Sequence, residues 1–245
     1  MTTIAEWKYR VRDFFYFTAT EWKDILITIL AISFAFAYND KSEVFNLAYW
    51  FANFGKVFFI VSLAIMGHII VQKISALYIG FRAEYKLWST GIYITILVTL
   101  LTQGKIYIIL PGGIVFFHMT MLRLGHFRYG LNLTTSGMIA ALGPLANLVM
   151  ATFWETLALN GVFPQFFHQM TFINLYIAVF TMLPIPKLDG FNTFYGSRLL
   201  YSYFFSFLVA YIVLYTLGIF SLLWAAIIGF FAYISWWFYF ERKTV

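Results

Sequence analysis

Residues 56–77 read KVFFIVSLAIMGHIIVQKISAL, and this stretch decides the kind of fold that the chain can adopt. Polar side chains interrupt the apolar run at only a few positions, among them His68 and Gln72. A helix rises about 1.5 Å per residue, so a helix over this stretch covers the roughly 30 Å of a bilayer's hydrocarbon core. The stretch therefore predicts a transmembrane helix.

The composition of the whole chain agrees with a membrane protein. Its 245 residues are 62% hydrophobic and only 11% charged, whereas soluble domains carry roughly 25% charged residues. This excludes a water-soluble globule and predicts membrane lipid as the solvent. The net charge of +6 comes without a dense run of Lys and Arg, so we expect no nucleic-acid partner. The absence of cysteine excludes disulfides and thiolate metal sites.

Five further apolar runs approach spanning length, which predicts an all-α, multi-pass membrane protein with about six transmembrane helices. The other five helices are expected over residues 22–38, 136–159, 168–182, 201–217 and 219–240. We expect a single membrane domain over 1–245. It is divided into an N-terminal segment with the first span over 1–55, a core over 56–200, and a helical hairpin over 201–245 that turns at Gly218.

The region between the second and third predicted helices follows a different pattern. Residues 80–130 hold short apolar pieces interrupted by glycines, and Pro111-Gly112-Gly113 lies between the β-branched runs 106–109 and 114–115. Pro-Gly-Gly is a turn signal, so we predict a membrane-associated hairpin or re-entrant insertion here.

The basic residues predict the orientation. With the N-terminus in the cytoplasm, every Lys and Arg except Lys41 and Lys56 falls on the cytoplasmic side of the predicted spans, Lys105 included. Because cytoplasmic loops are enriched in basic residues, we expect a cell-membrane protein with both termini in the cytoplasm.

Ionisable groups inside a membrane are costly, so each one is a candidate functional residue. His68 and Asp189 are both expected near the cytoplasmic third of the membrane, where they could meet. Structural roles are also open for both. His68 could share a hydrogen bond with Gln72 or a neighbouring helix, and Asp189 before Gly190 could cap the next helix.

Four motifs in order resemble the site-2 protease family of intramembrane zinc metalloproteases. They are the helix turn at His68 followed by Gly80, the Pro111-Gly112-Gly113 segment, residues 142–147 (LGPLAN) and residues 183–190 (LPIPKLDG). In that family two histidines four residues apart and an aspartate hold zinc, with a glutamate after the first histidine as general base. The resemblance implies His68 and Asp189 as ligands and a fold that admits an extended substrate strand beside its hairpin.

This chain departs from the family pattern at decisive positions. Ile69 occupies the general-base position, Gln72 the second histidine position, and Thr181 the asparagine position before the Pro-x-Pro segment. Isoleucine cannot carry a proton, and an amide oxygen is a poor zinc ligand compared with imidazole. We therefore predict a catalytically inactive pseudoprotease without a cofactor, or with weakly held zinc at His68, Asp189 and Gln72. Transmembrane polypeptide segments are its expected partners, in a groove formed by Gly112, Gly113, Asn147, Pro184 and Pro186.

Two other functions stay open. An active zinc metalloendopeptidase could recruit His118 or His126 as a further ligand. A structural subunit of a membrane complex is also compatible with the sequence. A solute pathway is disfavoured because the Pro-x-Pro-x-x-Asp-Gly segment has no second copy, whereas transporters usually carry internal repeats.

Overall fold

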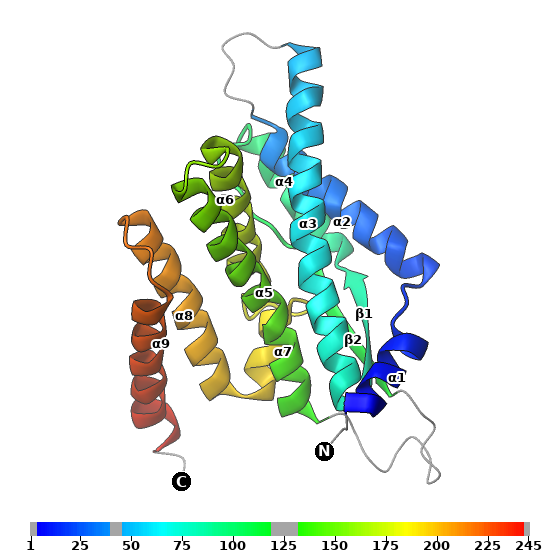
Figure 1. The fold of residues 1–245 in the computed structure, drawn as a ribbon, viewed down its shortest axis with the longest axis vertical. Helices are drawn as coiled ribbons and strands as arrows, with labels where there is room; N and C mark the ends of the chain where they lie inside the picture. Colours follow the sequence, from blue (N-terminus) through cyan, green and yellow to red (C-terminus); the bar gives the residue numbers. More distant parts are fainter. Residues whose placement is uncertain (1–3, 40–45, 119–131, 243–245) are drawn as a thin grey trace.

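The computed structural model describes residues 4–39, 46–118 and 132–242, which are mostly helical. Figure 1 shows an elongated bundle in which α3, α5 and α6 lie between α2 on one side and α8 and α9 on the other. In chain order the elements are α1 Ile4–Phe14, α2 Ala19–Ala37, α3 Leu47–Ile79, β1 Phe81–Leu87, α4 Ser89–Leu101, β2 Gly112–His118, α5 Leu133–Leu159, α6 Pro164–Thr181, α7 Asp189–Gly196, α8 Arg198–Thr216, α9 Leu222–Trp236 and a π-helical turn Trp237–Glu241.

The long apolar helices make this a membrane protein. Among the described residues, four helices are long and apolar enough to span a bilayer: α3, α5, α8 and residues Leu222–Glu241. Helices also occupy the other two predicted positions, but they are more polar. α2 begins with Glu21, Lys23 and Asp24, and α6 carries glutamines, His168 and Asn174. The two additional spans therefore stay a prediction.

Local sequence signals explain where the main helices begin and end. The side chain of Asn46 accepts hydrogen bonds from the N–H groups of Ala48 and Tyr49 at the start of α3. Asn132 plays the same part for α5. Gly80 ends α3 with φ of +104°, a left-handed conformation that glycine adopts without strain. Capping by short polar side chains stabilises each helix start by about 1 kcal/mol.

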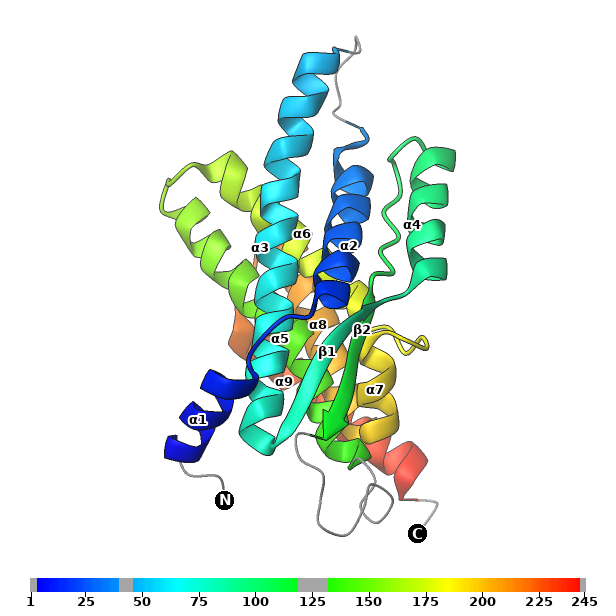
Figure 2. The same cartoon turned by 90° about the vertical axis from the view of Figure 1, so that its right-hand side faces the viewer.

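The region between α3 and α5 departs from the all-α prediction. β1 and β2 form a two-stranded antiparallel sheet that pairs Phe81 with His118 and Leu87 with Gly112. Figure 2 shows the strands side by side, with α4 rising from their upper end. The predicted turn at Pro111-Gly112-Gly113 is wrong, because Gly112 and Gly113 begin β2 directly after Pro111 and residues 106–109 form no strand. Gly112 instead allows β2 to approach β1 closely, since a Cβ at this position would overlap the carbonyl oxygen of Lys86.

The position of Lys105, just after α4, differs from the prediction. A Cβ on Gly104 would lie 2.9 Å from Cβ of Asn39, so the residues after α4 pack against the end of α2. Lys105 therefore lies at the same end of the bundle as Asn39, not at the end where α1 lies. The sequence pattern missed this because it treated the insertion as returning to the cytoplasmic side.

Candidate functional site

The two ionisable residues singled out from the sequence lie in direct contact. Nε2 of His68 on α3 lies 2.7 Å from Oδ2 of Asp189, the first residue of α7. Both side chains are almost completely buried, with exposed fractions of 5% and 1%. The predicted meeting is confirmed, and the capping role for Asp189 is wrong because its carboxylate turns toward α3 and the sheet. His68 does not pair with Gln72.

Gln72 reaches a backbone group that a proline has released. Its amide nitrogen donates to the carbonyl oxygen of Ala140 at 2.8 Å. That carbonyl would ordinarily accept from the residue four positions later, but this is Pro144, which has no N–H. The bond fixes Gln72 with its nitrogen toward α5. Its Oε1 is buried and has no hydrogen-bond partner among the described residues.

Gly143 allows α5 to approach these two side chains closely. A Cβ at this position would overlap Nε2 of His68 and Nε2 of Gln72. The backbone of α5 therefore forms one wall of the site. It leaves room for two flat side chains on α3 but none for a methyl group.

Asp189 and Asn192 also bind the free edge of β2. Oδ1 of Asp189 accepts a 3.4 Å hydrogen bond from the N–H of Ile114, and Nδ2 of Asn192 donates to the Ile114 carbonyl oxygen at 3.4 Å. Gly113 makes this possible, since a Cβ there would lie 2.8 Å from the carbonyl oxygen of Lys187. A strand added at Ile114 would have to displace both side chains.

The opposite edge of the sheet is occupied as well. Oε1 of Glu21 accepts from the N–H of Tyr85 at 2.9 Å, and Oδ2 of Asp24 accepts from the N–H of Leu87 at 3.3 Å. Tyr85 and Ile114 face each other across the sheet, so their outward groups belong to opposite edges. Burial raises the pKa of the Tyr85 hydroxyl, which shares a 2.9 Å hydrogen bond with Thr28.

A buried ion pair beside the sheet was not anticipated from the sequence. The ammonium of Lys73 lies 2.6 Å from Oε2 of Glu21 and 2.9 Å from the carbonyl oxygen of Tyr16. It also lies 4.1 Å from the ring centroid of Phe17. The sequence predicted Lys73 at the cytoplasmic end of its helix, and its partner Glu21 lies 52 residues away along the chain.

The described residues do not fit a zinc site of the family type. They contain no group of three His, Cys, Asp and Glu side chains able to hold a metal ion. His68 and Asp189 contact each other directly, and the nitrogen of Gln72 rather than its oxygen faces Gly143. Zinc sites in proteins usually take three or four imidazole, thiolate or carboxylate ligands. No chemical step through zinc follows from this arrangement.

The predicted groove residues do not form one surface. Gly112 and Gly113 are buried in the sheet, and Asn147 is fully buried, with neither side-chain polar atom bonded to a described residue. Pro184 and Pro186 are exposed in the turn before α7. Thr181 is also turned away from the site, because its hydroxyl donates to the Ile177 carbonyl oxygen of its own helix.

The other candidate ligands lie elsewhere. His118 ends β2 four residues after Ile114, which places its backbone about 13 Å along the strand from the Asp189 contact. His126 lies outside the described residues. Glu84 pairs with Arg82, and Glu155 accepts a hydrogen bond from Nδ1 of His168 at 3.0 Å, toward the other end of the bundle. None of the described alternatives joins His68 and Asp189.

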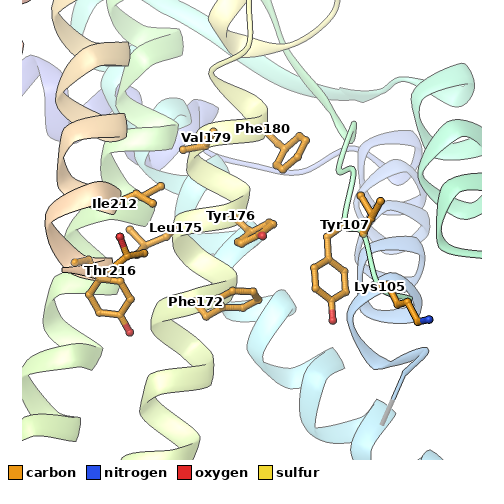
Figure 3. A pocket seen from close by; sticks show the side chains of 11 residues that line it. Lys105, Tyr107, Phe172, Leu175, Tyr176, Val179, Phe180, Ile212 and Thr216 are labelled. Carbon is orange, nitrogen blue, oxygen red and sulfur yellow. The ribbon is translucent and has the colours of Figure 1, made fainter. Parts of the chain in front are cut away.

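A lateral groove runs along α6 toward the site. It encloses about 590 Å³ between α6, α8 and residues 105–107. Figure 3 shows Phe172, Tyr176 and Phe180 of α6 facing Tyr107 across the groove. Phe180 precedes Thr181, the last residue of α6, so the groove ends close to the turn that leads into α7 and Asp189. This surface, unlike the predicted residue set, could hold an apolar segment.

Comparison with known proteins gives a distant relative. A protein of Methanocaldococcus jannaschii named "Putative zinc metalloprotease" is 29% identical to this chain over 191 residues, which cover 72% of this chain and 84% of the relative. No sequence profile of a known family matches the chain. No solved structure gives a significant match. The relative and the apolar helices fit a membrane protein that is metalloprotease-like.

Proposed function

We propose that this chain is a member of the site-2 protease family that has lost catalysis and binds transmembrane polypeptide segments without cutting them. The observation that carries the proposal is the direct contact between His68 and Asp189, with Ile69 at the general-base position and the Gln72 nitrogen bonded to Ala140. In this contact the imidazole of His68 is itself the hydrogen-bond partner of the Asp189 carboxylate. General-base catalysis contributes about 10²–10⁴ in rate, and Ile69 supplies none of it.

The binding surface in this proposal is the lateral groove along α6. Because Glu21, Asp24, Asp189 and Asn192 occupy the central groups on both sheet edges, strand addition there would require breaking four hydrogen bonds. The groove requires no such exchange, and its floor is aromatic and apolar. A helical or unwinding apolar segment would therefore be held beside α6, with both termini of the protein in the cytoplasm. α1 and the end of α9 lie at one end of the bundle, which fits two termini on the same side of the membrane (Figure 1).

Metal content tests the loss of catalysis. Purified wild type is compared by elemental analysis with Gln72→His and with Ile69→Glu/Gln72→His. We expect zinc only in the variants, because they restore the missing imidazole. Zinc at one ion per wild-type chain would overturn the proposal. It would favour the competing function, an active metalloprotease with an atypical ligand set, for which the unpartnered Oε1 of Gln72 is the supporting observation.

Cross-linking tests the binding surface. A photoreactive amino acid replaces Phe180 in the groove or, as a matched control, Val149, which is 64% exposed on α5. A synthetic single-span Leu/Ala peptide is reconstituted with each variant. Cross-links from position 180 alone are expected, whereas equal labelling would favour a purely structural subunit.

A further inference from the structure

A polar chamber lies at the end of the bundle where α3 begins. It encloses about 900 Å³ and is lined by side chains from the end of α2, from α3, α6 and α8, and from the segment before β2. Asn53, Gln165 and Gln169 contribute amides, and Lys56 and His168 contribute basic groups. Such a concentration of donors in one cavity suits an anionic group better than an apolar one.

The chamber continues into the apolar groove along α6. Tyr107, Phe172 and Tyr215 line both cavities. In Figure 3 the hydroxyl of Tyr107 points away from Phe180, toward the part of the groove where Phe172 lies. The two cavities therefore form one path that is polar at one end and apolar along the rest. This is the chemical pattern of an amphiphile.

The charges along this path have one sign. Lys56 and Lys105 line the chamber and the groove, and no carboxylate appears among the described residues that line either one. Figure 3 shows the Lys105 amine turned away from the groove, so Lys56 is the stronger head-group candidate. Neither lysine forms an ion pair with another described residue.

Glu155 orients the second basic group. Its Oε2 accepts from Nδ1 of His168 at 3.0 Å and from the Tyr215 hydroxyl at 3.3 Å. The Glu155 side chain is 6% exposed and that of His168 is 45% exposed. A carboxylate that accepts from Nδ1 fixes the orientation of the imidazole, so the ring of His168 is held at the wall of the chamber.

We propose that the chamber and the groove together bind an anionic lipid. The head group lies between Lys56, His168 and the two glutamines, and one chain lies along α6 between α8 and Tyr107. Lipid is the natural occupant because the helices on both sides of the groove belong to a membrane protein. The groove is also the surface assigned above to a polypeptide segment, so lipid and polypeptide compete for it. The lipid site itself does not depend on that function.

Native mass spectrometry of the detergent-purified chain tests the proposal. The protein is titrated with dioleoylphosphatidylglycerol and, separately, with the zwitterionic dioleoylphosphatidylcholine. We expect phosphatidylglycerol to bind at least tenfold more tightly. Lys56→Gln/His168→Gln should abolish this preference, since the first substitution removes the charge of Lys56 and the second replaces the imidazole by an amide that can still donate to Glu155. Val179→Trp should weaken both lipids about tenfold by filling the groove.

Matched controls lie away from the path. Lys86→Gln removes an exposed lysine on β1, and Val213→Trp adds the same bulk on a face of α8 that is 50% exposed. Ile212→Trp fills the groove from the α8 wall and replaces Val179→Trp if that variant unfolds. Equal binding of the two lipids by wild type, or the same binding by the site variants and their controls, would overturn the proposal. Displacement of phosphatidylglycerol by inorganic phosphate alone would also overturn it, because the site would then recognise a free anion.

Discussion

The ammonium of Lys73 lies between both carboxylate oxygens of Glu21, 2.8 Å from Oε1 and 2.6 Å from Oε2, and both side chains are nearly inaccessible. Lys73 belongs to α3 and Glu21 to α2, and Oε1 also binds the N–H of Tyr85 in β1. One ion pair therefore joins two helices and the sheet, close to the contact between His68 and Asp189.

Breaking this ion pair should strongly destabilise the protein. Lys73→Met leaves the Glu21 carboxylate buried without a counter-charge, so we expect a loss of about 3–5 kcal/mol in the free energy of unfolding. Glu6→Gln, which removes a more exposed pair with Arg10, should cost less than about 1 kcal/mol. Unfolding in mixed micelles, followed by tryptophan fluorescence, measures both. Similar losses for the two variants would contradict the role given to Lys73.

Gly143→Ala should displace His68. The added methyl group overlaps the imidazole and the Gln72 amide, and overpacking of this kind typically costs about 1–3 kcal/mol. Gly55→Ala is the matched control in α3, since nothing lies within 4 Å of its added Cβ. There alanine should stabilise the helix by up to about 1 kcal/mol. Thermal unfolding in detergent should therefore show a lower midpoint for Gly143→Ala and a higher midpoint for Gly55→Ala. Equal shifts of the two midpoints would contradict the close approach of α5 to His68.

The Tyr85 hydroxyl should make stability fall at high pH. Burial raises its pKa, so above about pH 10 the unfolded chain releases a proton that the folded chain keeps. The free energy of unfolding should therefore decrease with rising pH, by at most about 1.4 kcal/mol per pH unit from this group. Tyr85→Phe should lessen the decrease, whereas Thr28→Val, which removes the same hydrogen bond, should keep it. The same slope in Tyr85→Phe and wild type would count against this assignment.

Asp24→Ala should open the edge of β1 at one position. The Leu87 N–H loses its acceptor, so its amide should exchange with deuterium about tenfold faster or more. Lys23→Ala, one residue earlier and exposed, is the control. Mass spectrometry of a peptide covering 85–88 follows the exchange. Unchanged protection in Asp24→Ala would show that the strand edge is covered in another way.

The length of the apolar runs in the sequence was enough to locate the six main helices. Runs such as 201–217 leave a membrane helix as the only structure that satisfies the backbone in lipid. The sheet was harder to predict, because β1 contains Arg82, Glu84 and Lys86 and reads as a polar loop. Its partner lies beyond α4, and no local signal gives that pairing.

The contact between His68 and Asp189 was predictable because both were expected at one depth in the membrane. The position of Gln72 was not, since its hydrogen bond depends on a carbonyl released by a proline in another helix. The buried direction of Lys73 depends likewise on Glu21, 52 residues away. Such pairings follow from tertiary packing, which spacing along one helix does not encode.

The missing N–H of Pro144 has a consequence for what can stand at position 72. The Ala140 carbonyl oxygen needs a hydrogen-bond donor from α3. An amide or an imidazole at position 72 can donate to it, whereas a carboxylate would place two acceptor oxygens against each other. A metal-bound imidazole ordinarily gives its other N–H to such a carbonyl, which holds the ring in its coordinating tautomer. A histidine at position 72 would thus have a backbone acceptor on α5, and a single substitution, Gln72→His, separates the present interhelical hydrogen bond from a side chain able to bind a metal ion.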